Sequence, residues 1–120
     1  MGVIEEPQRI HITTIGRRTG LPRTIEILAQ PEGDGILLVA SRAGAARNPA
    51  WYHNLLANSN VTVQVTDGPT VVMRARVTAG EERDRLFNEA AARFPFFADY
   101  QRRTVRRIPV VLLELPGKGG

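Results

Sequence analysis

Residues 10–29 read IHITTIGRRTGLPRTIEILA. Apolar side chains alternate with polar or small ones from Ile10 to Ile15, a pattern that predicts a strand with one face buried. A second strand is expected from Thr24 to Ala29, and the glycine-rich turn at 16–23 joins the two. This segment therefore predicts the first two strands of an antiparallel sheet.

The residues that follow add three more strands. Residues 31–35 predict a turn, and the continuous apolar run at 36–40 predicts a strand covered on both faces, which extends the first two strands into a β-meander. Residues 61–66 and 71–78 show the clearest alternation in the chain, and the turn at 66–69 predicts that they form a hairpin.

A short helix is expected before this hairpin. Asn48 is predicted to be its N-cap and Pro49 its first residue. The helix should run through Ala57 and stop at Asn58-Ser59-Asn60.

A longer helix is expected after the hairpin. Carboxylates that favour the helix dipole crowd its first turn, namely Glu81, Glu82 and Asp84. Its apolar stripe consists of Leu86, Phe87, Ala90, Ala91 and Phe94. Pro95 should end or kink this helix, a last short helix should carry Tyr100, and residues 108–115 predict a sixth strand.

Six antiparallel strands with a few helices predict a mainly β fold, a small barrel with helical additions, because a twisted sheet removes its exposed edges by curling closed. The 120 residues, 42% of them hydrophobic, can bury one core but hardly two. One domain over residues 1–120 is therefore expected, with residues 1–8 and 116–120 flexible.

Composition limits the classes of function. The chain has no Cys, which excludes a disulfide framework, a thiol nucleophile and a zinc ribbon, and which fits a cytoplasmic protein. The N-terminus carries no long apolar run, so neither a signal peptide nor a membrane span is expected. The formal charge is +4, and all but one of the sixteen basic residues are Arg.

The turn at residues 16–23 is where the sequence points to a ligand. The guanidinium groups of Arg17, Arg18 and Arg23 can each bind two phosphate oxygens. Gly16 and Gly20 let the backbone turn tightly, so that N–H groups can face the same anion. The pattern favours a phosphorylated, polyanionic ligand such as a cofactor; the alternative is an exposed, solvated basic turn.

Residues 41–55 form a second candidate segment. Its small residues let a flat ligand lie close to the backbone, the start of the following helix offers unpaired N–H groups, and Trp51 offers an aromatic face. A planar heterocycle would suit this segment. The alternative is that Trp51, Leu55 and Leu56 are only the buried stripe of a short helix.

These segments together resemble the deazaflavin-dependent nitroreductase family, over Thr13 to Leu115. The resemblance rests on four blocks: Thr14-Ile15-Gly16-Arg17-Arg18-Thr19-Gly20 with Pro22-Arg23; Val39-Ala40-Ser41-Arg42; Asn48-Pro49-Ala50-Trp51-Tyr52-His53-Asn54-Leu55; and Tyr100-Gln101 with Thr104 and Arg107-Ile108-Pro109-Val110. It implies a split β-barrel, like the FMN-binding split barrels, that binds coenzyme F-420, an 8-hydroxy-5-deazaflavin with an oligoglutamate tail.

The resemblance also implies roles for single residues. The phosphate and the acidic tail of the cofactor would bind to Arg17, Arg18, Thr19 and Arg23. The deazaflavin ring would lie against Val39, Ala40, Ser41 and Arg42, and the cofactor wall would be completed by Trp51 and Asn54.

The implied reaction is hydride transfer from the reduced deazaflavin to a small electrophilic acceptor, such as an enone, a quinone or a nitroaromatic. Relatives that reduce nitro compounds are rich in Tyr around the substrate. This chain has a less polar set of substrate-pocket residues, Leu28, Phe94, Phe97 and the retained Tyr100. Tyr100 and Ser41 are the candidate catalytic residues, because a hydroxyl can donate a hydrogen bond to the oxygen on which negative charge develops.

The other polar residues suggest no further chemistry. His11 and His53 lack the spacing of metal ligands, so no metal is expected. Four carboxylates are expected to form a solvated helix face rather than an acid/base pair: Glu81, Glu82, Asp84 and Glu89.

Two other classes of function stay open. One is a non-catalytic carrier or sensor that binds F-420, FMN or another planar anionic ligand. The other is a nucleic-acid module that uses Arg74, Arg76, Arg102, Arg103, Arg106 and Arg107. Nucleic acid is not expected as a partner, because few aromatic residues lie among these arginines. The sequence leaves open whether the protein is a monomer or a homodimer, and which acceptor it reduces.

Overall fold

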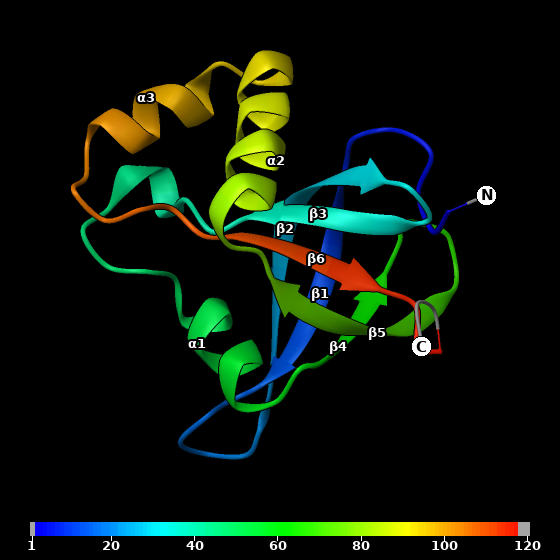
Figure 1. Cartoon of the computed structure of the whole chain (residues 1–120). Coiled ribbons are helices and arrows are strands. Elements are labelled where there is room, and N and C mark those ends of the chain that lie inside the picture. The colour runs from blue at the N-terminus through cyan, green and yellow to red at the C-terminus, as the bar shows by residue number, and fades with distance from the viewer. Residues whose placement is uncertain (1, 118–120) are drawn as a thin grey trace.

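Six antiparallel strands close into a barrel in the computed structural model, which describes residues 2–117 (Figure 1). The strands are β1 (Gln8–Ile15), β2 (Pro22–Glu32), β3 (Gly35–Val39), β4 (Asn60–Gln64), β5 (Thr70–Val77) and β6 (Val110–Glu114). Their order around the barrel is β1-β2-β3-β6-β5-β4, and β4 pairs with β1 to close it. The predicted fold class is confirmed.

The barrel closes because β1 pairs on both sides. Ile12 lies opposite Ile25 of β2 and also opposite Val63 of β4, and Ile12 and Val63 are fully buried. The three strands β1, β2 and β3 form the predicted meander. β6 lies between β3 and β5, so the last strand of the chain completes the wall.

β3 has no exposed face. Ile36 and Leu38 point into the barrel core, whereas Leu37 and Val39 lie in a second apolar cluster on the outside of the barrel. Two helices cover that outer cluster, α2 (Gly80–Arg93) and α3 (Phe96–Arg102) (Figure 1). The prediction of a strand covered on both faces is confirmed.

α1 (Ala50–Ala57) packs against β1, apart from the other two helices (Figure 1). Trp51 and Leu55 of α1 belong to the barrel core. The helix ends at Ala57 as predicted. It begins at Ala50, so the predictions that Asn48 is its N-cap and Pro49 its first residue are wrong; Pro49 occupies the N-cap position. The side-chain oxygen of Asn48 accepts a hydrogen bond from Arg106 instead.

Most strand ends differ from the prediction by one to three residues, and two of these differences have a clear physical reason. β2 continues to Glu32 rather than stopping at Ala29, because Gln30, Pro31 and Glu32 pair with β3 and leave only Gly33-Asp34 as the turn. Gly33 has a positive φ of 58°, which glycine adopts without strain. β6 begins at Val110 rather than at residue 108, since Pro109 has no N–H to donate to a neighbouring strand.

Residues 1–8 and 116–120 are predicted to be flexible, and the structure describes only part of them. Residue 1 and residues 118–120 lie outside the described part, so for them this stays a prediction. Within the N-terminal segment, Ile4 is buried in the barrel core. Across residues 2–117, no helix is both long and apolar enough to cross a membrane.

Candidate functional site

The β1–β2 loop is held in one shape by its own backbone. The N–H of Gly16 donates to Leu21 O at 2.8 Å, and the N–H of Gly20 donates to Gly16 O at 2.8 Å. A Cβ at Gly16 would lie 2.6 Å from the Thr19 hydroxyl oxygen, and Gly20 has a φ of 71°. The positive φ of Gly20 favours glycine there, and a side chain at Gly16 would displace that of Thr19; Arg17 and Arg18 are both exposed.

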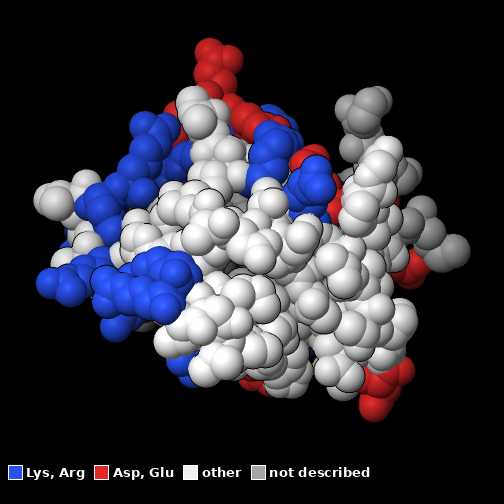
Figure 2. Space-filling view, turned by 90° about the horizontal axis from the view of Figure 1, so that it is seen from below, with Lys and Arg blue, Asp and Glu red and all other residues white. Residues whose placement is uncertain are grey.

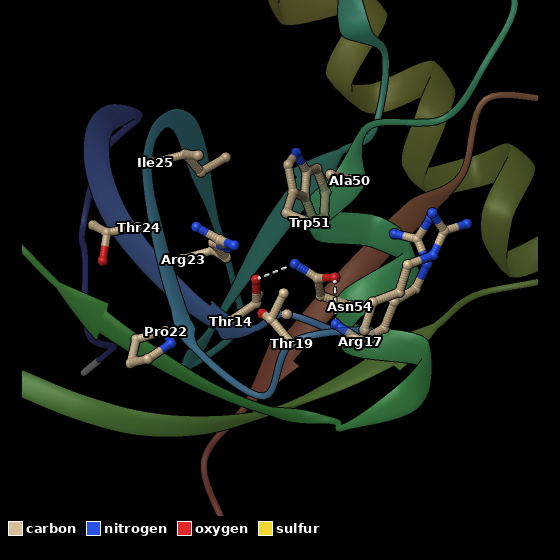
Figure 3. A pocket seen from close by; sticks show the side chains of 12 residues that line it. Thr14, Arg17, Thr19, Pro22, Arg23, Thr24, Ile25, Ala50, Trp51 and Asn54 are labelled. Atoms are coloured by element: carbon tan, nitrogen blue, oxygen red, sulfur yellow. Dashed lines mark hydrogen bonds between the residues drawn. The ribbon is translucent and has the colours of Figure 1, made fainter.

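Asn54 fastens this loop to α1. Its Oδ1 accepts a hydrogen bond from the backbone N–H of Arg17 at 3.1 Å, and its Nδ2 donates to Thr14 Oγ1 at 3.1 Å. Figure 3 shows the Asn54 amide between these two partners. The side chain is only 4% exposed, so losing it would leave buried polar groups without partners.

A cleft of about 580 Å³ opens between this loop, the start of β2 and α1. We call it the loop cleft; it is lined by Thr14, Gly16, Arg17, Arg18, Thr19, Pro22, Arg23, Thr24, Ile25, Ala50, Trp51 and Asn54 (Figure 3). A volume of this size suits a small organic ligand or part of a cofactor.

A second cavity of about 740 Å³ adjoins the loop cleft, because Arg17, Ile25, Ala50 and Trp51 line both. We call it the basic groove. Its other lining residues are Arg42, Ala46, Arg47, Asn48, Pro49, His53 and Arg106. Figure 2, which views the molecule from the side of α1, shows Lys and Arg side chains gathered at one side of this face, beside a broad uncharged area.

Most guanidinium groups around the two cavities face no carboxylate. Among residues 2–117, this holds for Arg17, Arg18, Arg23, Arg42 and Arg47, all of them exposed. Such a cluster repels itself unless an anion binds, so the charge pattern favours a negatively charged ligand.

The cavities bring together seven of the ten cofactor residues that the sequence predicts. They are Arg17, Arg18, Thr19, Arg23, Arg42, Trp51 and Asn54. Val39, Ala40 and Ser41 do not line either cavity. These three are buried immediately before Arg42, with exposed fractions of 5%, 0% and 9%.

The predicted substrate-pocket residues lie together, but in the outer apolar cluster rather than in the two cavities. Leu28, Phe94 and Tyr100 pack at its edge, and Phe97 is buried within it. The Tyr100 ring lies 5.5 Å from that of Phe96 and 6.3 Å from that of Phe97. The backbone of α3 touches the loop after β3, since a Cβ at Gly44 would lie 2.7 Å from Tyr100 O.

Sequence reasoning did not select the four other polar residues of the basic groove as site residues, namely Arg47, Asn48, His53 and Arg106. Three of them lie within residues 41–55, so the signal was present in a segment already singled out. Arg106 had no such signal, because its contacts lie about sixty residues away in the sequence.

Three of the four carboxylates of α2, namely Glu82, Asp84 and Glu89, belong to ion pairs. Glu82 binds Arg76 at 2.8 Å, and Glu89 binds Arg85 at 3.2 Å. Asp84 binds Arg107, whose hydrogen bond is the main cause that lowers the pKa of this carboxyl group. These groups do not form an acid/base pair, and within residues 2–117 no three metal-binding side chains come together.

Comparison with known proteins gives consistent matches. The family model described as F420H(2)-dependent quinone reductase matches residues 3–115. An F420H(2)-dependent quinone reductase of Mycobacterium tuberculosis is 37% identical over 113 residues, which are 89% of this chain and 73% of that protein.

Two solved structures share the fold and a third of the sequence. One, of an F420-H2 dependent reductase, has a TM-score of 0.79 and 33% identity and covers 92% of this chain and 97% of its own. The other, described as a domain-swapped dimer, has a TM-score of 0.80 and 33% identity over 92% of this chain and 83% of its own.

Proposed function

Because the chain belongs to the F420H(2)-dependent quinone reductase family, we propose that it binds coenzyme F-420 in the loop cleft and the basic groove and reduces an acceptor that lies at α3. The activity follows from the family: the chain is an F-420-dependent quinone reductase. The observation that carries the proposed location is the gathering of unpaired guanidinium groups around two adjoining cavities.

The residues present fit this cofactor. F-420 carries a phosphate and a tail of carboxylates, and bidentate guanidinium groups are the side chains best suited to both. Arg17, Arg18 and Arg23 surround the loop cleft, and Arg42 and Arg47 extend the positive charge along the basic groove. Trp51 lines both cavities with the 7% of its surface that is exposed, and we propose that the deazaflavin lies against it.

The bound cofactor supplies the hydride from its reduced deazaflavin ring. The chain's own residues bind its anionic groups, fix its orientation and exclude water from the ring. Ser41 and Tyr100 are proposed to donate hydrogen bonds to the acceptor oxygen as it gains negative charge. Ser41 directly precedes Arg42 of the basic groove, and Tyr100 lies on the helix that touches the same loop.

The apolar cluster at α3 supports a preference among acceptors. Leu28, Phe94 and Phe97 present carbon atoms where hydroxyl groups would otherwise compensate the nitro oxygens of a substrate. We therefore propose that quinones and apolar enones are reduced faster than bulky bicyclic nitroimidazoles. A cytoplasmic location, and a monomer or homodimer, are parts of the same proposal.

The test is a titration of the purified chain with F-420 and with FMN, followed by mixing of the reduced complex with a quinone, an enone and a nitroimidazole. We expect tighter binding of F-420, because several arginines suit a longer anionic tail better than a single phosphate, and faster oxidation by the quinone. Equal or tighter binding of FMN would contradict the cofactor assignment. Binding without turnover of any acceptor would instead indicate a carrier.

A further inference from the structure

Arg106 binds four oxygen atoms of one distant loop. Its Nε donates to Ala45 O at 2.8 Å, and its Nη2 donates to Ser41 O at 2.7 Å. Its Nη1 donates to Ala40 O at 3.2 Å and to Asn48 Oδ1 at 2.7 Å. All four acceptors are uncharged, so the side chain fastens the loop without losing its positive charge.

The loop that Arg106 binds has an unfavourable backbone conformation. Arg42 and Ala43 have φ angles of 46° and 52°, in the left-handed region that residues with a Cβ rarely adopt. Such a conformation persists only where the surrounding structure imposes it. The contacts of Arg106 lie on both sides of these two residues, and Gly44 packs directly against α3.

The conformation of this loop decides where Arg42 lies. Arg42 lines the basic groove, and so does Arg106 itself. Burial lowers the pKa of the Arg106 guanidinium, and the nearby positive charge of Arg42 lowers it further. Two like charges are thus kept close together, and the four oxygen acceptors offset the cost of their repulsion.

We propose that Arg106 is a positioning residue for cofactor binding, which holds the loop at residues 40–48 so that Arg42 faces the basic groove. This inference rests on the proposed function, because it requires that the groove binds F-420. Arg106 lies outside this loop and is not one of the predicted cofactor-binding residues. Its proposed role is to hold Arg42 in place rather than to contact the cofactor directly.

The test is a double-mutant cycle between Arg106→Gln and Arg42→Ala, read as the Kd for F-420 well below the melting temperature. We expect Arg106→Gln to weaken binding about tenfold, because a released loop withdraws Arg42 from the groove. The variant with both substitutions should bind F-420 as tightly as whichever single variant binds it more weakly, because both substitutions remove the same contact of Arg42. At saturating F-420, kcat of Arg106→Gln should stay within about twofold of wild type, so that the loss lies in KM.

Two further variants complete the design. Arg106→Lys keeps the charge, but one ammonium group cannot reach four oxygens, so its affinity should lie between those of wild type and Arg106→Gln. The matched control is Arg74→Gln, which removes one exposed charge from β5 and should leave Kd within about twofold. A second cycle between Arg106→Gln and Arg18→Ala should be additive, because Arg18 lies on the other loop.

Three results would overturn the inference. The first is a lower melting temperature for Arg106→Gln with an unchanged Kd, which would make its role purely structural. The second is full additivity with Arg42→Ala. If Arg106→Gln does not fold, Arg106→Lys carries the same comparisons. The third is an unchanged Kd for F-420 in both Arg18→Ala and Arg42→Ala. That result would show that the proposed cofactor site itself is wrong.

Discussion

Two groups of arginines in this protein differ in their partners. Around α2, Arg76 binds Glu82 at 2.8 Å and Glu114 at 3.1 Å, and Arg85 binds Glu89 at 3.2 Å. Around the loop cleft and the basic groove, the described residues offer no carboxylate to Arg17, Arg18, Arg23, Arg42 or Arg47. The net charge of +4 is therefore unevenly distributed.

This difference separates structural charges from charges available to a ligand. An exposed ion pair contributes little to stability, and its two charges largely cancel for any third ion. Unpaired cations held by a rigid loop keep their full attraction for an anion. The composition of the chain cannot distinguish the two groups, but their partners in the fold can.

The largest effect is expected for Arg17→Ala combined with Arg23→Ala. Two charge-assisted hydrogen bonds contribute about 1.5–3 kcal/mol each, so F-420 affinity should fall more than about 100-fold. The melting temperature should hold, because both side chains are exposed. Titration of the cofactor checks this, with Arg76→Ala combined with Arg85→Ala as the control. Equal losses from both pairs would abolish the distinction between the two groups.

A smaller effect is expected for Tyr100→Phe. Loss of one hydrogen-bond donor to the reacting oxygen costs about 1–3 kcal/mol, which predicts a roughly five- to 150-fold lower kcat for a quinone. F-420 affinity and the melting temperature should hold, since Phe keeps the ring packing against Phe96 and Phe97. Tyr52→Phe changes the chain's other tyrosine, on α1, and should leave kcat unchanged. Steady-state kinetics of both variants measure this. A lower kcat for Tyr100→Phe alone would support an acceptor site at α3, and an unchanged kcat would contradict it.

Asn54→Ala tests whether cofactor binding by the unpaired arginines requires that the β1–β2 loop be held to α1. The substitution leaves the Arg17 N–H and the Thr14 hydroxyl without a partner, which should cost about 2 kcal/mol of unfolding free energy. Affinity for F-420 should also fall about tenfold, because the β1–β2 loop is released from α1. Asn58→Ala, at the exposed end of the same helix, should change neither quantity much. Unchanged affinity in Asn54→Ala would show that the loop keeps its shape alone.

The barrel was predictable because its information is local. Alternation along residues 10–15, 61–66 and 71–78 predicts strands, and the continuous apolar run of β3 predicts that both of its faces are covered. The glycine-rich turn between two strands likewise indicates a basic loop. The family resemblance then supplied the cofactor, which no single residue of this chain reveals.

The supports of the site were not predictable, because each depends on a partner far along the chain. Asn54 was expected to form part of the cofactor wall, yet its amide reaches 37 residues back to Arg17 and 40 back to Thr14. Asn48 is a residue type that often caps helices, but its side-chain oxygen accepts a hydrogen bond from Arg106, which lies 58 residues further along the chain. A single polar residue fits several local roles, and only tertiary contacts select among them.

The smallest effect, and the one that completes the comparison, belongs to the paired arginines. The hydrogen bond from Arg76 lowers the pKa of the Glu82 carboxyl group, so the folded state binds a proton there less readily than the unfolded state. The stabilisation from this pair is therefore present above the ordinary pKa of Glu and is lost as the pH falls through the lowered one. Because the pair is exposed, Glu82→Gln should cost below about 1 kcal/mol at pH 7 and less near pH 3. Thermal melts of wild type and variant at both pH values measure this, and F-420 affinity at pH 7 should be identical in the two. A change in affinity would mean that the charges around α2 also act on the cofactor, and that the two groups of arginines are coupled rather than separate.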